Sequence, residues 1–175
     1  MRRSGGVALK AAEDNVDVRF LDYASERDCA LIGQLLNEYA ADGMGGGKPL
    51  DDDVVKNVGR KLGEVPGAVS VAAFDGATNE PVGLVNALPG FSTFRSMPLL
   101  NVHDVMVREA YRGKGIAPQM LRLVEEEAVR RGCCKLTLEV LSNNTAAQRS
   151  YAKMGFKAYE LDPTAGQAMF WEKSL

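Results

Sequence analysis

The sequence is poor in cysteine and has no strong excess of charge of one sign. Only three of its 175 residues are cysteines, and an odd count with two neighbours, Cys133 and Cys134, is not a disulfide framework. This pattern favours the reducing environment of the cytoplasm. The formal net charge is −2, whereas proteins that bind phosphate backbones carry an excess of lysine and arginine. We therefore expect a cytoplasmic protein without a nucleic-acid partner.

Long apolar runs are also missing. No segment approaches the roughly 20 apolar residues of a membrane-spanning helix, so we expect no membrane partner. The N-terminus is basic but lacks the apolar stretch of a signal peptide, and residues 1–14 are predicted to form a disordered leader. Residues 15–175 then form a single domain, which is large enough for a hydrophobic core.

The alternation of apolar and polar residues predicts the order β-α-α-β-β-β-α-β-α-β-β. Ser25 and Asp51 are the expected N-caps of the first two helices. The other elements follow from apolar periodicity, with strands at 16–21, 69–74, 82–88, 99–107, 136–140, 156–161 and 168–171, and helices at 116–131 and 144–154. The apolar residues Phe91, Phe94 and Met97, in the connection 89–98, either line a binding pocket or cover the sheet.

The most informative segment is the turn formed by Arg112, Gly113, Lys114 and Gly115, between a predicted buried strand and a helix that begins at Ile116. Backbone N–H groups at a helix N-terminus lack partners, and the helix dipole adds partial positive charge there. A phosphate group can accept hydrogen bonds from these N–H groups, and glycine leaves room for its close approach. The segment predicts a phosphate site, unless the glycines serve only the geometry of a tight turn.

Two common phosphate-binding motifs do not match this turn. A Walker loop ends in Gly-Lys-Ser/Thr, but Lys114 is followed by Gly115 and Ile116. A dinucleotide-binding turn needs three glycines after an early strand, whereas this turn lies past the middle of the chain. Both motifs are therefore excluded.

A second block of residues follows the turn. Its members reproduce the spacing Asn-x-x-Ala-x-x-x-Tyr-x-x-x-Gly-Phe, with Asn144, Ala147, Tyr151, Gly155 and Phe156. Together with the sequence Arg-Gly-Lys-Gly-Ile-Ala at 112–117, this block resembles the GCN5-related N-acetyltransferase (GNAT) superfamily. The close resemblance covers residues 101–161. It implies an α/β (mixed α+β) fold, in which a mixed, mostly antiparallel sheet of six or seven strands has about four helices on its two faces.

The resemblance also implies how acetyl-CoA is held. The strands at 99–107 and 136–140 run parallel and splay apart, and the cofactor enters the opening. The first of these strands offers backbone groups to the pantetheine arm, and the N–H of Met106 or Val107 polarises the thioester carbonyl. The residues expected to contact acetyl-CoA are Val105, Met106, Val107, Arg112, Gly113, Lys114, Gly115, Ile116, Ala117, Asn144 and Tyr151. For Asn144 the alternative is a plain helix N-cap, and for Lys114 a solvated surface charge.

Tyr151 is the expected general acid. It lies two helical turns after Asn144 and therefore on about the same face of the helix. By resemblance its hydroxyl protonates the departing thiolate. The alternative is an aromatic residue of the core.

The general base is less well defined. His103 is the only histidine and a candidate because imidazole titrates near neutrality, and Glu139 is a second candidate. Both have structural alternatives. Residues 101, 103, 105 and 107 share one strand face unless a bulge intervenes, so Asn101, His103 or Asp104 could meet the incoming amine.

We expect an acetyl-CoA-dependent N-acetyltransferase in which a primary amine attacks the thioester directly within a ternary complex. The acceptor is a small molecule, a peptide or a protein, and no metal is expected. Two alternatives remain open, an acyltransferase that uses another acyl-CoA donor and a catalytically silent acetyl-CoA-binding sensor or interaction module. No motif encodes the acceptor, and a homodimer is left open.

Overall fold

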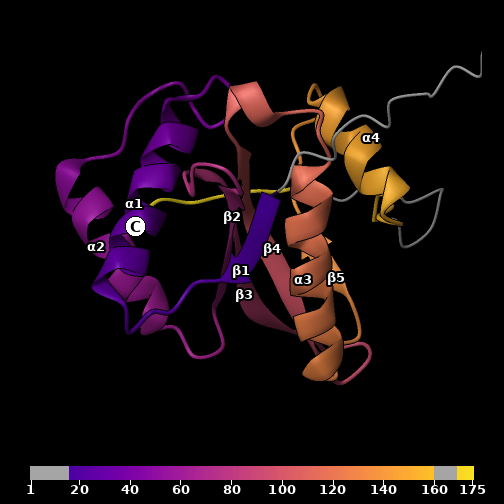
Figure 1. Cartoon of the computed structure of the whole chain (residues 1–175). Coiled ribbons are helices and arrows are strands. Elements are labelled where there is room, and N and C mark those ends of the chain that lie inside the picture. Colours follow the sequence, from indigo (N-terminus) through magenta and orange to yellow (C-terminus); the bar gives the residue numbers. More distant parts are fainter. Residues whose placement is uncertain (1–15, 160–168) are drawn as a thin grey trace, which may run out of the picture.

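The computed structural model describes residues 16–159 and 169–175. Its elements follow the order β1 (Val16–Phe20), α1 (Glu26–Ala41), α2 (Asp52–Gly63), β2 (Val69–Asp75), β3 (Pro81–Ser92), β4 (Met97–Val107), η1 (Glu109–Tyr111), α3 (Ile116–Arg130), β5 (Leu136–Leu138) and α4 (Thr145–Lys153). The strands form one sheet in the order β1-β2-β3-β4-β5 (Figure 1). The pairs from β1 to β4 are antiparallel and the β4–β5 pair is parallel. The predicted mixed, mostly antiparallel sheet is confirmed.

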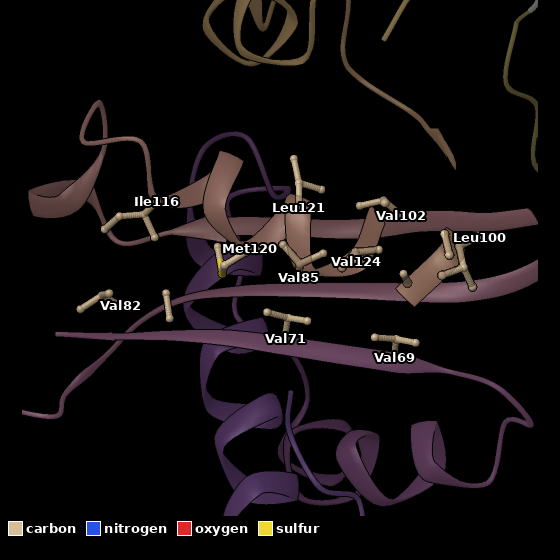
Figure 2. Close-up of a cluster of buried hydrophobic side chains, with 13 residues drawn as sticks. Val69, Val71, Val82, Val85, Leu100, Val102, Ile116, Met120, Leu121 and Val124 are labelled. Carbon is tan, nitrogen blue, oxygen red and sulfur yellow. The ribbon is translucent and has the colours of Figure 1, made fainter. Parts of the chain in front are cut away.

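Helices cover both faces of this sheet, with α1 and α2 on one side and α3 on the other (Figure 1). On the α3 side, Ile116, Leu121 and Val124 pack against valines of the strands (Figure 2). On the α1 side, Ile32 and Leu35 are fully buried in a second cluster. The removal of these side chains from water stabilises the sheet between its two layers of helices. Within the two described ranges, no helix is long and apolar enough to cross a membrane.

Both predicted helix starts lie where the sequence placed them. The Asp28 N–H donates a hydrogen bond to Ser25 Oγ at 3.2 Å, so Ser25 caps α1. Asp51 is the N-cap of α2, but its side chain makes no capping hydrogen bond. The carboxylate of Asp51 therefore contributes only its charge near the positive end of the helix dipole.

The sheet differs from the prediction in its strand count, because the described residues contain five strands rather than six or seven. β5 ends at Leu138, since β4 pairs with it only through residues 100–102. The described parts of the last two predicted strands, 156–159 and 169–171, contain no strand. Alternating apolar residues mark a strand face but do not supply the partner edge that a strand needs. The predicted leader, 1–14, and residues 160–161 and 168 lie outside the described residues.

The predicted connection at 89–98 is instead part of a long β3–β4 hairpin. β3 continues to Ser92 and β4 begins at Met97. Phe91 and Phe94 are 60% and 85% exposed, so their rings do not cover the sheet.

A bulge interrupts β4 at His103. Asp104 lies opposite Asn86 of β3, and Val102 lies opposite Ala87, so His103 is the extra residue between them. A bulge of this kind moves the following side chains to the other face of the strand.

The alternation of side chains between the two faces of the sheet is therefore reversed after this point of β4. Val102, before the bulge, packs in the α3-side cluster, whereas Met106 packs in the α1-side cluster. Asn101 and Asp104 consequently share the α1 face. The unbroken alternation of residues 101, 103, 105 and 107 does not hold in the structure.

Candidate functional site

The turn before α3 is open around its two glycines. Gly113 and Gly115 have φ angles of +79° and +78°, and apart from chain neighbours no described heavy atom lies within 4 Å of a Cβ added at either. Gly115 is the N-cap of α3, and no side chain in the described part of the chain caps this helix. The N–H groups of Ile116 and Ala117, in the first turn, have no acceptor within the helix, and the helix dipole adds positive charge there. The turn is therefore suited to accept an anion.

The two cations of the turn already have partners. Arg112 Nη2 lies 2.6 Å from Asp42 Oδ2, and Arg112 Nε donates to the Val107 carbonyl at 2.9 Å. The hydrogen bond from Arg112 lowers the pKa of Asp42. Lys114 Nζ lies 5.2 Å from the centre of the Tyr111 ring, a cation–π contact. Arg112 thus fixes the turn to the end of α1 and to β4, while both residues add positive charge beside it.

β4 continues beyond its pairing with β5. The two strands pair only between residues 100–102 and 136–138, whereas β4 runs on to Val107. Within the described ranges, the β5-facing edge of β4 beyond Val102 has no strand partner. Such an edge offers N–H and C=O groups that an extended ligand can pair with. Val105 and Met106 lie on this stretch, but the Val107 carbonyl is already used by Arg112.

α4 carries the next two predicted residues. The Ala147 N–H donates to Asn144 Oδ1 at 3.1 Å, so Asn144 is the N-cap of α4 and its Nδ2 group remains a donor. The Tyr151 ring packs against the α3-side cluster, 5.9 Å from the centre of the Phe156 ring. Burial, and to a smaller extent the neighbouring Tyr39, raises the pKa of Tyr151 to about 12. Tyr151 therefore keeps its proton over the working pH range of most enzymes.

Asn101 links β4 to β5 just before the point where the two strands separate. Its Nδ2 group donates to Thr137 Oγ1 at 3.0 Å and to Glu139 Oε1 at 3.2 Å. The other amide atom, Asn101 Oδ1, is buried and has no hydrogen-bond partner in the described part of the chain. A buried oxygen without a donor is costly.

The two neighbouring residues at the bulge of β4, His103 and Asp104, differ in their exposure to solvent. His103 is exposed, whereas Asp104 is half-buried. Burial, and after it the Asp104 carboxylate, raises the pKa of Tyr39 on α1. Tyr39 is thus coupled electrostatically to Asp104 of β4 and to Tyr151 of α4. No group of three or more metal-ligating side chains occurs within 16–159 and 169–175.

Tyr39 has no counterpart among the predicted site residues. The sequence places it only in the apolar stripe of the first helix, and its local pattern is that of a core residue. Its relation to Asp104 and Tyr151 depends on long-range packing. No local signal could have identified it.

Residues 32–156 match the family model described as the Acetyltransferase (GNAT) family. The chain is 30% identical over 139 residues to the thialysine N-epsilon-acetyltransferase of Bos taurus, and the match covers 75% of this chain and 80% of the relative. It is 42% identical over 74 residues to acetyltransferase Atu2258 of Agrobacterium fabrum, covering 41% of this chain and 53% of the relative. The match thus spans about half the length of the Agrobacterium protein.

The fold also has a solved counterpart. The structure of AAC(6')-Iy in complex with the bisubstrate analogue CoA-S-monomethyl-acetylneamine aligns with 92% of this chain and 99% of that chain. The TM-score is 0.72 and the sequence identity is 18%. At this identity the likeness concerns the fold, and it agrees with the predicted architecture.

Proposed function

The chain belongs to the Acetyltransferase (GNAT) family, and we propose that it is an acetyl-CoA-dependent N-acetyltransferase that acts on the primary amine of a small molecule. The family supports acyl transfer from an acyl-CoA to an amine in general. The observation that carries the finer proposal is the open, uncapped N-terminus of α3, with Gly113 and Gly115 at positive φ beside the free edge of β4. A pyrophosphate and an extended amide chain need these two features together.

The residues present fit acetyl-CoA. When bound, it supplies the thioester whose carbonyl carbon the amine attacks. The N–H groups of Gly115, Ile116 and Ala117 would bind the pyrophosphate, and Val105 and Met106 would pair with the pantetheine arm. Asn144 Nδ2 adds a side-chain donor. The predicted oxyanion donor is a backbone N–H of Met106 or Val107.

We assign proton donation at the leaving sulfur to Tyr151. Its pKa of about 12 keeps the hydroxyl protonated in the free protein. An ordinary thiol has a pKa of about 8.5, so complete proton transfer from this phenol to a thiolate is unfavourable. Tyr151 therefore acts first as a hydrogen-bond donor that stabilises the charge developing on sulfur.

The general base stays with the two predicted candidates, His103 and Glu139. Both are exposed, and Glu139 also accepts a hydrogen bond from Asn101. If His103 removes the amine proton, His103→Ala should slow turnover by about 10²-fold and flatten the acidic limb of the kcat/KM profile. An unchanged pH profile would assign this role to Asp104, Glu139 or a chain of water molecules.

We propose a small amine as acceptor because the relative that covers most of this chain is named for thialysine, an amino acid with a side-chain amine. AAC(6')-Iy is seen with an analogue that joins CoA to a neamine derivative, so aminoglycoside amines form a second class to test. Peptide and protein amines are the third.

The test is a calorimetric titration with acetyl-CoA, followed by an assay of thiol release with thialysine, lysine, neamine and a lysine-containing peptide. Binding together with release on a small amine supports the proposal. Binding without release on any amine would indicate the silent sensor module. A parallel series with succinyl-CoA separates the donor classes, since faster turnover with succinyl-CoA would contradict the acetyl assignment.

A further inference from the structure

An acid at the end of α1 pairs with one of the cations of the proposed phosphate site. Asp42 Oδ2 lies 2.6 Å from Arg112 Nη2, although the two residues are 70 positions apart in the chain. Arg112 directly precedes Gly113 in the turn before α3. Carboxylates and phosphates bind a guanidinium in the same way, because both accept its N–H groups with negatively charged oxygens. Asp42 and a phosphate bound at the turn are therefore alternative partners for Arg112.

Asp42 is held in place by its own segment of the chain. Its second carboxylate oxygen, Oδ1, accepts a hydrogen bond from the Met44 N–H at 2.9 Å. Its backbone carbonyl accepts from the N–H groups of Gly45 at 2.9 Å and Gly47 at 3.0 Å. None of these contacts involves Arg112. The carboxylate is therefore fixed beside the turn independently of its ion pair.

An acid is an unfavourable choice at this position of a helix. Asp42 is the C-cap of α1, and the last turn of this helix contains no basic residue. The C-terminus of a helix carries partial negative charge, which favours cations and disfavours carboxylates. Arg112 supplies the missing positive charge, but the pairing neutralises part of the charge that the turn offers to an anion. The stability of α1 alone does not explain why an acid stands here.

The Arg112 guanidinium has a second anchor at the turn. Its Nε donates to the Val107 carbonyl at 2.9 Å, so the group stays beside β4 whichever anion its Nη atoms contact. A guanidinium has five N–H groups, and the contacts to Val107 and Asp42 use two of them. The side chains of Arg112 and Asp42 are 49% and 28% exposed. Ion pairs that are exposed to this extent are weak, so a more highly charged anion competes effectively with Asp42.

Competition for Arg112 has a consequence because acetyl-CoA and CoA carry the same phosphate groups. Contacts to these phosphates hold the product as firmly as the substrate, and such uniform binding does not accelerate the chemical step. Release of the product limits turnover in many enzymes. A carboxylate that recaptures Arg112 as the phosphates withdraw weakens the binding of both molecules, and it shortens the time for which CoA stays bound.

We propose that Asp42 is a positioning residue for Arg112, which competes with the pyrophosphate of the cofactor and thereby promotes the release of CoA. The inference rests on the proposed N-acetyltransferase function and adds a residue that sets how fast the product leaves. In this role Asp42 acts only through Arg112 and needs no contact with the substrate. Its removal should strengthen CoA binding, whereas the removal of a residue that only supports the turn should weaken it.

The binding test measures the affinity of the full chain for acetyl-CoA and CoA by calorimetry, and the dissociation rate of CoA by stopped flow. Asp42→Asn keeps an acceptor for the Met44 N–H and removes the charge that holds Arg112. Both molecules should bind about 3- to 5-fold more tightly, which is the size of an exposed ion pair, and CoA should dissociate more slowly.

The matched control is Glu109→Gln. Glu109 is an exposed acid of η1, three residues before Arg112, and in the described part of the chain its carboxylate does not pair with Arg112. The substitution removes the same charge near the turn without freeing the guanidinium. The affinity for CoA should change by less than about 2-fold, because solvent and salt screen an exposed charge.

A double-mutant cycle tests whether Asp42 acts through Arg112. In an Arg112→Ala background, Asp42→Asn should no longer strengthen CoA binding. Unchanged or weaker CoA affinity in folded Asp42→Asn, or an equal gain in Glu109→Gln, would overturn the inference. Asp42→Ser also keeps an acceptor for the Met44 N–H, and it decides the matter if Asp42→Asn does not fold.

The proposed function and the role of Asp42 fail in different ways. Tighter CoA binding by Asp42→Asn without acetyl transfer to any amine would refute only the proposed function. Active enzymes in which wild type and Asp42→Asn are inhibited equally by the product CoA would refute only the role of Asp42. If the wild-type chain does not bind acetyl-CoA, both are refuted.

Discussion

Replacement of Gly115 by valine tests the anion site against a control on the same helix. Gly115 precedes α3 with φ of +78°, and Gly132 follows the helix with φ of +70°. An added Cβ meets no described heavy atom within 4 Å at either position, apart from chain neighbours. A β-branched residue is strained at both sites by the backbone angle and not by collisions. Gly115→Val and Gly132→Val therefore differ mainly in that only the first lies at the proposed phosphate site.

The effect of valine on stability and its effect on acetyl-CoA binding can be estimated separately. A non-glycine residue in the left-handed region costs about 1–3 kcal/mol of folding free energy, and this applies to both variants. Hydrogen bonds to a charged partner contribute about 1.5–3 kcal/mol each. If the introduced isopropyl group of Gly115→Val keeps the pyrophosphate from two N–H groups, binding should weaken by about 3–6 kcal/mol, or roughly 10²- to 10⁴-fold.

The assay combines calorimetric titration with acetyl-CoA and chemical unfolding of both variants. We expect a similar loss of unfolding free energy in the two proteins, and a loss of acetyl-CoA affinity only in Gly115→Val. Unchanged affinity in a folded Gly115→Val protein would remove the phosphate assignment. Equal losses of affinity in both variants would show that valine acts through global destabilisation.

Three further substitutions address other parts of the site and the fold. Tyr151→Phe should lower kcat by about 10- to 10³-fold with unchanged KM for acetyl-CoA, and because the pKa of Tyr151 is about 12, a pH–rate comparison should give the same ratio from about pH 6 to about pH 10. Asn144→Asp keeps the cap of α4 but loses the Nδ2 donor, so calorimetry should show weaker acetyl-CoA binding without loss of thermal stability. Asn144→Ala should in addition lower the free energy of unfolding by about 1 kcal/mol. The hydrogen bond from Arg130, above all, lowers the pKa of Glu127 to about 2 in the folded protein. The ionised carboxylate therefore stabilises the fold at any pH above its pKa in the unfolded chain, and this stabilisation is lost as the pH falls to the folded-state pKa. Urea unfolding of Glu127→Gln should show a deficit of about 1 kcal/mol at neutral pH that disappears near pH 2.

Features that depend on neighbouring residues were predictable from the sequence. Ser25 and Asn144 are helix caps because a short polar side chain can accept from the N–H three residues on. The turn before α3 followed from Gly113 and Gly115, since its left-handed backbone angles favour glycine. These interactions form within a few residues, so the local sequence contains all the partners.

Features that depend on distant partners were not predictable. The length of β5 is set by how far β4 stays beside it, and residues 139–140 have strand-like composition but no strand partner among the described residues. Tyr23, Ser70, Asn86 and Asp104 are joined by hydrogen bonds although they come from four segments, and the first three carry no motif. A serine or asparagine in a strand is ordinary in sequence, and only the register of β2, β3 and β4 brings these side chains together.

The bulge at His103 explains why a carboxylate can stand at this point of β4. In an unbroken strand the residue two positions after Val102 would return to the same face, so the Asp104 side chain would enter the apolar cluster under α3. Burial of an unpaired carboxylate among apolar side chains costs several kcal/mol. The extra residue turns Asp104 to the other side, where it meets the amide of Asn86. His103 therefore sets the direction of the Asp104 side chain through its backbone, whatever its imidazole ring does in proton transfer.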